Sequence, residues 1–347
     1  MAKVKPKFNV PIILAMIALC CACAGAAGIL LYFSGDALLS RLGIPNPVDN
    51  SQPVVSAPTE TPQPEVTTPP PTEDTSNLPE WTVLVYSAAD DEGLEELMVL
   101  DINEMELVGS NPQMNIVVQI DRYEGAYDGD GDWTDARRYL ITQDNDLYSI
   151  ASPILENLGE VDMGDPQTLM DFVSWAIQNY PAQKYALIMS DHGGGWTGGY
   201  QDAFSDSQMT LPEIVSSLEG IRQNTSLDKF EVIIFDACLM AQIEVFGSLY
   251  PYSNYVLASE EIIPGYGLSH AAWLGRVAQD PEMDGIGLSQ AIISTYITDD
   301  IFLTDYASYS EGEIAQEKAQ FTLSAVESAR IPDVIGAMNQ FISVMAE

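Results

Sequence analysis

Residues 185–196 read YALIMSDHGGGW, and this stretch decides the fold, because an apolar run passes directly into a polar, glycine-rich segment. A short apolar run without polar alternation is typical of a strand that is buried on both faces of a sheet. Residues 232–240, VIIFDACLM, follow the same plan, and similar runs occupy residues 83–86, 116–120 and 255–258. The sequence therefore predicts buried strands at these places.

Helical patterns separate the strands, over residues 94–105, 166–180 and 210–221. Gly109 supplies a stop signal after the first helix, and Thr210 with Glu213 forms a capping-box pair at the start of the third. Strands that alternate with helices favour an α/β fold with a mainly parallel sheet covered by helices. Ligands of such sheets bind beyond the carboxyl ends of the strands, so we expect the reactive residues there.

The chain has 347 residues and is strongly acidic, with 51 Asp and Glu against 13 Lys and Arg and a formal charge of −38. All of the acids follow residue 33, whereas Lys3, Lys5 and Lys7 precede it. A nucleic-acid partner is excluded, because recognition of a polyanion rests on Lys and Arg side chains that neutralise phosphates. An acidic surface instead attracts cationic ligands.

The N-terminal part of the chain predicts a membrane anchor. Residues 10–33 are uncharged and largely apolar, and this length is sufficient to cross a hydrocarbon core of about 30 Å. The lysines before them predict a cytoplasmic tail at residues 1–9 and export of the rest. A cleaved signal peptide, with residues 22–24 as its small-residue cleavage site, is the alternative and also exports the rest. Residues 34–79 are rich in Pro and Thr and predict an extended extracellular linker.

The remaining residues divide into a main domain at residues 80–285 and a C-terminal continuation at residues 286–347. The continuation is expected to be helical, with one apolar pattern over residues 321–329 and another over residues 335–342. The sequence stops at Glu347 without a glycine, proline or basic residue to end the last helix, so we expect a longer natural chain.

Cys238 is the single cysteine outside the predicted membrane segment, so the exported part has no second cysteine with which it could form a disulfide. A cysteine in such a place is either a small buried hydrophobe or a nucleophile. His192 stands at the same relative place after another strand, so we expect an imidazole and a thiol to meet at one sheet edge, where the imidazole favours the thiolate. The N–H groups of Gly193 and Cys238 are candidates for stabilising an oxyanion.

Four blocks of the sequence resemble the clostripain family of cysteine peptidases. They are residues 81–90, 191–196, 235–240 and 258–267, which read WTVLVYSAAD, DHGGGW, FDACLM and ASEEIIPGYG. The resemblance implies a caspase-like α/β/α sandwich and a dyad of Cys238 and His192. In this dyad Cys238 would attack the scissile carbonyl, and His192 would protonate the leaving amine and later activate water.

The resemblance also implies a substrate preference. Family members generally cleave after Arg or Lys, and the residue two before the nucleophile lines the P1 pocket. That residue is Asp236, whose carboxylate would pair with a cationic side chain. The fourth block adds Ser259 and Glu260 as candidate substrate-binding residues.

Two departures from the family pattern affect processing and the substrate cleft. Family members usually cut themselves at a basic residue shortly after the histidine block, but no Lys or Arg lies between His192 and Arg222. Gly267 is followed by Leu268 where the family often has Trp. The sequence predicts a membrane-anchored, extracytoplasmic cysteine endopeptidase for peptides and proteins with basic residues. A surface binding module that has lost activity and an acyl transferase with the same dyad are the alternatives.

No metal or other cofactor is predicted. Residues 128–132 carry acids at alternating positions, as a calcium loop does, but Trp133 replaces the glycine that an EF-hand needs next, so we predict a hairpin turn. Because some family members depend on calcium, a calcium site remains open. Asp191 is expected either to orient His192 or to cap the turn after it, and His270 to be a surface or structural residue.

Overall fold

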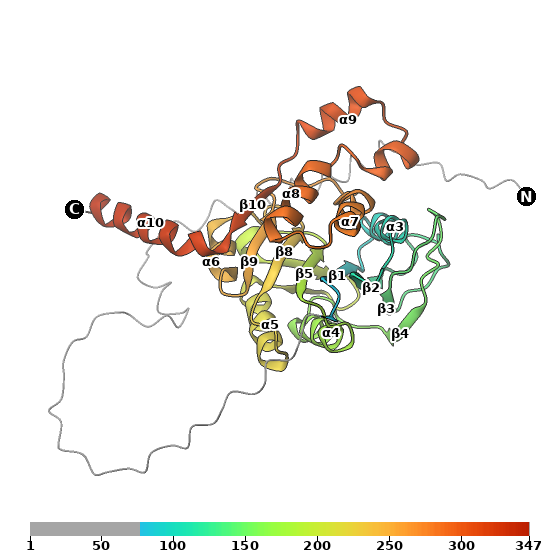
Figure 1. Cartoon of the computed structure of the whole chain (residues 1–347), viewed down its shortest axis with the longest axis horizontal. Coiled ribbons are helices and arrows are strands. Elements are labelled where there is room, and N and C mark those ends of the chain that lie inside the picture. The colour runs from blue at the N-terminus through green and yellow to red at the C-terminus, as the bar shows by residue number, and fades with distance from the viewer. Residues whose placement is uncertain (1–76, 347) are drawn as a thin grey trace, which may run out of the picture. The chain divides into compact units, whose positions relative to one another are not determined.

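The computed structural model describes residues 77–346. Their centre is an eight-stranded sheet with the strand order β10-β9-β8-β5-β1-β2-β3-β4 (Figure 1). The strands of this sheet are β1 (Trp81–Ala89), β2 (Met114–Arg122), β3 (Ala136–Leu140), β4 (Ile154–Gly159), β5 (Lys184–Ser190), β8 (Phe230–Asp236), β9 (Ser253–Ala258) and β10 (Ser324–Glu327). A separate two-stranded sheet pairs β6 (Gly199–Asp202) with β7 (Ser207–Met209).

All of the strands predicted from apolar runs are confirmed, and they are β1, β2, β5, β8 and β9. They pair in parallel at the centre of the sheet. The antiparallel strands β3 and β4 extend one edge, and the antiparallel β10 extends the other. These edge strands lack a continuous apolar run, so the apolar pattern of the sequence does not predict them.

Helices cover both faces of the sheet, as predicted. They are α3 (Glu95–Glu106), α4 (Pro166–Asn179), α5 (Leu211–Asn224), α6 (Ile243–Leu249), α7 (His270–Gln279), α8 (Gly285–Thr295), α9 (Glu311–Lys318) and α10 (Ile331–Met345). Shorter helical turns are η2 (Gly195–Thr197), η3 (Phe302–Tyr306) and η4 (Ser328–Arg330). One face packs against α4, α5 and α6, and the other against α3, α7 and α8 (Figure 1).

The predicted helix boundaries are confirmed where a capping residue marks them. Thr210 and Glu213 form the capping box of α5. Gly109 ends the segment after α3 with a φ of +70°, and a Cβ at this position would lie 2.3 Å from the backbone nitrogen of Gln143. Only glycine accommodates both the left-handed backbone and this close approach.

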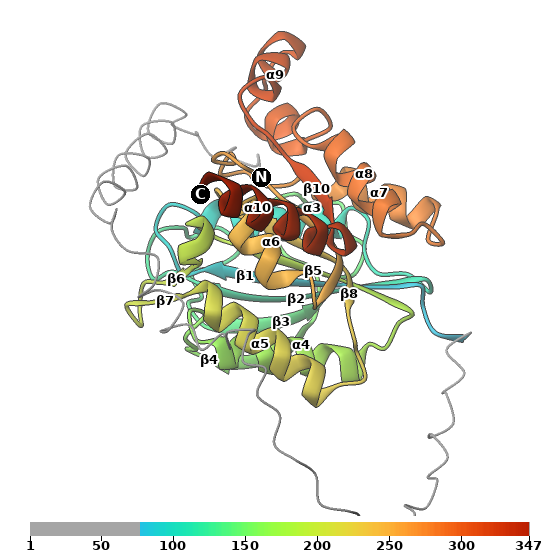
Figure 2. The same cartoon turned by 90° about the vertical axis from the view of Figure 1, so that its left-hand side faces the viewer.

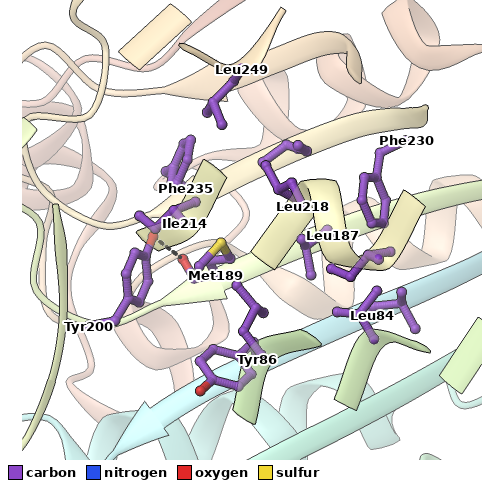
Figure 3. Close-up of a cluster of buried hydrophobic side chains, with 14 of the residues drawn as sticks. Leu84, Tyr86, Leu187, Met189, Tyr200, Ile214, Leu218, Phe230, Phe235 and Leu249 are labelled. Atoms are coloured by element: carbon purple, nitrogen blue, oxygen red, sulfur yellow. Dashed lines mark hydrogen bonds between the residues drawn. The ribbon is translucent and has the colours of Figure 1, made fainter. Parts of the chain in front are cut away.

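The core on the α5 side shows how the strands use their apolar residues (Figure 3). Leu187 and Met189 of β5 point toward Ile214 and Leu218 of α5, and all four side chains are buried. The hydroxyl of Tyr200 donates a hydrogen bond of 3.4 Å to the carbonyl of Met189. Burying an aliphatic side chain of this size contributes about 1.5–3 kcal/mol to stability, so this layer holds the central strands in place.

The prediction of a helix over residues 321–329 is wrong. Residues 324–327 form β10, which pairs with β9 and places Val326 opposite Val256. Leu323 and Ala325 pack against one core of the sheet and Val326 against the other, which is the two-residue period of a strand. Because β9 would otherwise expose an unpaired edge, the backbone hydrogen bonds to β10 override the helical pattern.

The rest of the C-terminal continuation is helical, as predicted. α8 covers the sheet, and β10 completes it, so the segment after residue 285 contributes to the main domain. α10 lies beside α6, whereas α9 stands out from the sheet (Figure 2) and buries none of its residues.

The predicted tail, anchor and most of the linker, up to residue 76, lie outside the described residues. Within residues 77–346, no helix combines the length and the apolar composition that a bilayer crossing requires.

Candidate active site

The loops after β5 and β8 bring the segments of His192 and Cys238 together. The two strands are adjacent and parallel, with Ser190 opposite Asp236 at their carboxyl ends. Each reactive residue follows two positions later in the chain. Gly193 packs so closely on the backbone of Cys238 that a Cβ at residue 193 would lie 2.1 Å from the Cys238 carbonyl oxygen. The two segments therefore lie in contact, and this contact requires glycine at position 193, whereas the meeting of the imidazole with the thiol stays a prediction.

The imidazole of His192 has a carboxylate partner, Asp91, that the sequence analysis does not assign. Asp91 follows β1, and its Oδ2 lies 3.4 Å from Nε2 of His192. Its Oδ1 accepts hydrogen bonds from the N–H groups of Gly93 at 2.7 Å and Leu94 at 3.0 Å, which fix the carboxylate. The hydrogen bond to Asp91 raises the pKa of His192 against the opposing effect of burial. The imidazole therefore keeps its proton to a higher pH than an isolated histidine does.

Asp191 binds the backbone. One of its carboxylate oxygens accepts a hydrogen bond from the N–H of Gln201, and the other finds no hydrogen-bond partner in the described part of the chain. Burial raises the pKa of Asp191 to about 8. Of its two predicted roles, the contacts favour anchoring of the segment that follows His192.

The thiol of Cys238 is partly exposed and lies beside the loop after β9. Its sulfur accepts a hydrogen bond from the N–H of Ile263 at 3.4 Å. Leu239 has a φ of +66°, which turns the chain so that its N–H donates to the carbonyl of Glu261 at 2.9 Å. The backbone surroundings thus orient the thiol, and the residue is partly exposed.

The two candidate substrate-binding residues of this loop differ. Ser259 is fully buried, and its hydroxyl lies 3.0 Å from that of Thr322 and accepts a hydrogen bond from the N–H of Glu261. This side chain fixes the loop, and the predicted contact of Ser259 with substrate stays a prediction. Glu260 is exposed and accepts a hydrogen bond of 3.1 Å from Ser324, and its substrate-binding role stays a prediction.

Asp236, which is predicted to line the P1 pocket, is buried. Ser190 donates a hydrogen bond of 3.3 Å to its Oδ2, whereas Oδ1 finds no partner among the described residues. Gly267 has a φ of +60°, and a Cβ there would lie 2.6 Å from Oδ2 of Asp236. Burial raises the pKa of Asp236 to about 7, so the carboxyl is poised between its neutral and charged forms.

Asp236 belongs to a group of buried acids, which we call the inner cluster, together with Asp101 and Glu104 of α3 and Asp300. Burial, and then the charges of neighbouring acids, raise the pKa of Asp101 and of Glu104. Among residues 77–346, no Lys or Arg forms an ion pair with these four acids. The inner cluster therefore gathers four acids that no Lys or Arg of the described residues neutralises.

His270 lies beside the inner cluster, with its Nε2 3.9 Å from Oδ2 of Asp236. The side chain is fully buried, and burial lowers the pKa of His270 to about 3, so the ring is neutral. The structural alternative for this residue is confirmed, and a surface position is wrong. The two ring nitrogens and the hydroxyls of Tyr266 and Tyr296 are buried without hydrogen-bond partners in the described region. Such groups have unused capacity for a polar ligand.

Two groups of side chains in the described region have ligand atoms spaced for a metal ion. Asp101, Asp236 and His270 form one, and Asp90, Glu160 and Asp202 form the other. The loop at residues 128–132 belongs to neither.

That loop connects the antiparallel strands β2 and β3, so the predicted hairpin turn is confirmed. The carbonyls of Gly129 and Gly131 accept hydrogen bonds from the guanidinium of Arg122. The guanidinium of Arg122 therefore holds this loop.

Comparisons with known proteins agree with the fold and with the motifs. The model of the clostripain family matches residues 85–347. Clostripain of Hathewaya histolytica is 27% identical over a match that covers 56% of this chain and 42% of clostripain, so the chain spans less than half the length of that relative.

Solved structures share the fold. A secreted C11 cysteine protease from Bacteroides thetaiotaomicron, in complex with an irreversible peptide inhibitor, has a TM-score of 0.55 and 21% identity, and the match covers 74% of this chain and 68% of that one. An inactive zymogen C11 protease from Parabacteroides distasonis has a TM-score of 0.51 and 20% identity, with 74% and 64% covered. Because the family model matches well over half of the sequence, the chain belongs to the clostripain family.

Proposed function

We propose that the protein is a cysteine endopeptidase in which Cys238 and His192 form a catalytic dyad. The observation that carries this proposal is the packing of the His192–Gly193 segment on the backbone of Cys238, beside an imidazole that Asp91 holds. A cysteine nucleophile works as a thiolate, and a protonated imidazole stabilises that thiolate. Asp91 supports this state, because its hydrogen bond raises the pKa of His192.

The proposed reaction has two steps. The thiolate sulfur of Cys238 attacks the scissile carbonyl carbon, and the electron pair of the C=O bond moves to the oxygen. The N–H groups of Gly193 and Cys238 stabilise this oxyanion, and His192 donates its proton to the leaving amine as the C–N bond breaks. His192 then takes a proton from the water that attacks the thioester, which releases the carboxylic acid and restores the thiolate.

We further propose that the inner cluster selects Arg or Lys at P1. Asp236 lies two residues before Cys238 and has an oxygen without a partner in the described region. The hydroxyl of Tyr296 is buried without a partner in the described region, and burial, followed by the charge of Asp236, raises the pKa of Tyr296. A guanidinium or ammonium is a hydrogen-bond donor and a cation, and the carboxylates, hydroxyls and neutral His270 of this region supply acceptors.

We also propose that residues 10–33 anchor the protein in the membrane and that the peptidase domain lies outside the cytoplasm. The length of the apolar segment and the three lysines before it support this location. Digestion of intact cells with an added protease should remove the domain if it is exported, whereas a protected domain would contradict the proposal.

Hydrolysis of peptides that differ only at P1 tests the proposed activity. The full chain should cleave after Arg and Lys and leave a Gln peptide intact, and Cys238→Ala should cleave none of them. An Arg-containing electrophile should add its mass to the protein but not to Cys238→Ala. A folded protein that neither hydrolyses the Arg peptide nor takes up the electrophile would be a binding module. Equal cleavage after Gln would retain the peptidase and reject the role of Asp236.

A further inference from the structure

The segment that follows His192 is rich in glycine, and its conformation must be fixed from outside. Residues 193–199, which we call the glycine-rich segment, contain five glycines. Glycine has more conformational freedom than any other residue, so this composition does not favour one backbone conformation. The proposed oxyanion donor, the N–H of Gly193, belongs to this segment, and such a donor is effective only when it is already in position. The contacts that fix the segment therefore affect catalysis.

Part of the order comes from hydrogen bonds within and beside the segment. The N–H of Gly194 donates a hydrogen bond of 2.7 Å to the carbonyl of Gly198, and the N–H of Tyr200 donates one of 3.2 Å to the carbonyl of His192. These bonds flank Gly193 and leave its N–H without a backbone acceptor in the described region, so this group is available to a substrate. None of these bonds joins the segment to the loop of Cys238.

That connection comes from Gln242, a residue to which the sequence analysis assigns no role. Gln242 follows Cys238 by four residues and stands at the N-cap position of α6. Its side chain makes no capping hydrogen bond to this helix. Instead, its Oε1 accepts a hydrogen bond of 3.2 Å from the N–H of Trp196. The amide of Gln242 therefore faces the glycine-rich segment.

Gly195 allows the amide of Gln242 to lie directly on the backbone of the segment. Gly195 is buried and has a φ of +64°. A Cβ at this position would lie 2.2 Å from Nε2 and 2.6 Å from Oε1 of Gln242. Such distances are too short for any side chain at residue 195. Gln242 thus holds the segment twice, by packing at Gly195 and by a hydrogen bond at Trp196.

The backbone that carries Gln242 is itself fixed. The N–H of Gln242 donates a hydrogen bond of 2.9 Å to the carbonyl of Met240, and the N–H of Ala241 donates one of 2.9 Å to the carbonyl of Ser259. Residues 239–242 directly follow Cys238 in the chain. The amide of Gln242 is therefore presented by the same stretch of backbone that presents the thiol.

We propose that Gln242 is a positioning residue, which fixes the glycine-rich segment relative to Cys238 and so places the N–H of Gly193 for the oxyanion. This inference rests on the peptidase activity proposed above and extends it to a residue that acts through Gly193. The negative charge on the substrate oxygen exists in the transition state and not in the bound peptide. Loss of Gln242 should therefore lower kcat much more than it raises KM.

Gln242→Met tests this role on the full chain, because methionine has a similar length but no oxygen that could accept the N–H of Trp196. It should lower kcat for an Arg peptide by about 10- to 10²-fold and change KM by less than about threefold. Gln242→Glu keeps an oxygen acceptor and should recover most of the loss. The control Gln290→Met makes the same exchange at an exposed position of α8 and should leave kcat unchanged. Equal kcat values for Gln242→Met and this control would overturn the proposal.

Two inhibitors separate the placement of Gly193 from the chemistry of the dyad. With iodoacetamide, the thiolate sulfur of Cys238 displaces iodide from carbon and no oxyanion forms, so Gln242→Met should be alkylated at an unchanged rate. With an Arg peptide aldehyde, the sulfur adds to the carbonyl and the oxygen occupies the oxyanion hole. Its Ki should therefore rise by about as much as kcat falls. An alkylation rate that falls as much as kcat would show that Gln242 acts on the dyad and would overturn the role through Gly193.

Gly195→Ala provides a second variant, because it disturbs the same contact from the opposite side. Combined with Gln242→Met, it should lower kcat by little more than the larger of the two single losses, since both changes break one contact. Losses that multiply would reject the shared contact. An unmodified protein that neither hydrolyses the Arg peptide nor reacts with iodoacetamide would reject the peptidase itself. That result differs from an active protein that tolerates Gln242→Met, which would reject the role of Gln242 alone.

Discussion

The inner cluster and a second group of acids, which we call the outer cluster, both lack a Lys or Arg partner in the described region. The outer cluster consists of Asp90, Asp121, Glu160 and Asp202. The two clusters differ in the atoms that surround the acids. The inner cluster adds the neutral ring of His270 and two tyrosine hydroxyls, and it lies near Cys238. The outer cluster has only carboxylates and backbone N–H groups, and Glu160 opens it to solvent.

This difference teaches that acidic charge does not define a cation site by itself. An Arg or Lys side chain donates several directed hydrogen bonds, so it benefits from mixed acceptors such as hydroxyls and a neutral imidazole. A calcium ion takes electron pairs from hard oxygens and needs little directionality. We therefore propose the organic cation for the inner cluster, where the acceptors are mixed, and not for the outer cluster.

The largest expected effect comes from removing the nucleophile, which should stop the reaction and leave both clusters unchanged. Cys238→Ala removes the nucleophile and should lower kcat/KM for an Arg peptide by about 10⁴-fold or more. The Tm of this variant should stay close to that of the unmodified protein, because both clusters are intact. Steady-state hydrolysis and thermal unfolding measure the two properties. Activity near that of the unmodified protein would show that hydrolysis does not proceed at Cys238. The inner cluster would then have no link to the reaction.

Asp236→Asn tests the assignment of the inner cluster. It should lower kcat/KM for an Arg peptide by about 10²- to 10³-fold, because a cationic side chain would lose its charged partner in a buried site. The matched variant Glu160→Gln removes an acid from the outer cluster and should leave P1 preference unchanged. Competition between Arg and Gln peptides gives the preference directly. Equal losses of Arg preference in both variants would break the comparison.

Asp91→Asn changes the residue that follows Asp90 of the outer cluster in the chain and lies beside the imidazole of His192. It should lower kcat/KM by a smaller factor, about 10- to 10²-fold. The hydrogen bond to Asp91 raises the pKa of His192, so its weakening should lower that pKa. Activity requires the protonated imidazole and is lost as pH rises through this value, so the alkaline limb of the kcat/KM profile should move to lower pH. A fall in Tm with an unmoved alkaline limb would assign Asp91 a purely structural role.

The smallest effect concerns stability beside the inner cluster. Gly267→Ala should destabilise the protein by about 1–2 kcal/mol, because it places a Cβ at a left-handed position and 2.6 Å from Asp236. The control Gly275→Ala lies within α7 with open space at the Cβ position and should stabilise by up to about 1 kcal/mol. Denaturant unfolding measures both. A neutral Gly267→Ala would show that the backbone beside Asp236 is not constrained.

The sequence predicts the central sheet well, because strands buried on both faces must be continuously apolar. The same logic locates His192 and Cys238 at the carboxyl ends of strands, and the structure shows β5 and β8 to be neighbours. The edge strand β10 escapes prediction, since its apolar residues also fit a helix and only the open edge of β9 decides between the two. The role of Asp91 is not predicted for a related reason. Its position directly after β1 can be read from the sequence, but its partner His192 lies about a hundred residues away.

The sequence by itself determined the α/β class, the central strands, the places of Cys238 and His192 after two of those strands, and the acidic charge of the chain. Each of these follows from local patterns, namely apolar runs, capping residues and the rarity of a residue type. Tertiary structure alone decided which acids stand together, which histidine is neutral and which is held by a carboxylate. Those properties depend on burial and on distances between segments that are remote in the chain, and the local sequence pattern predicts neither quantity.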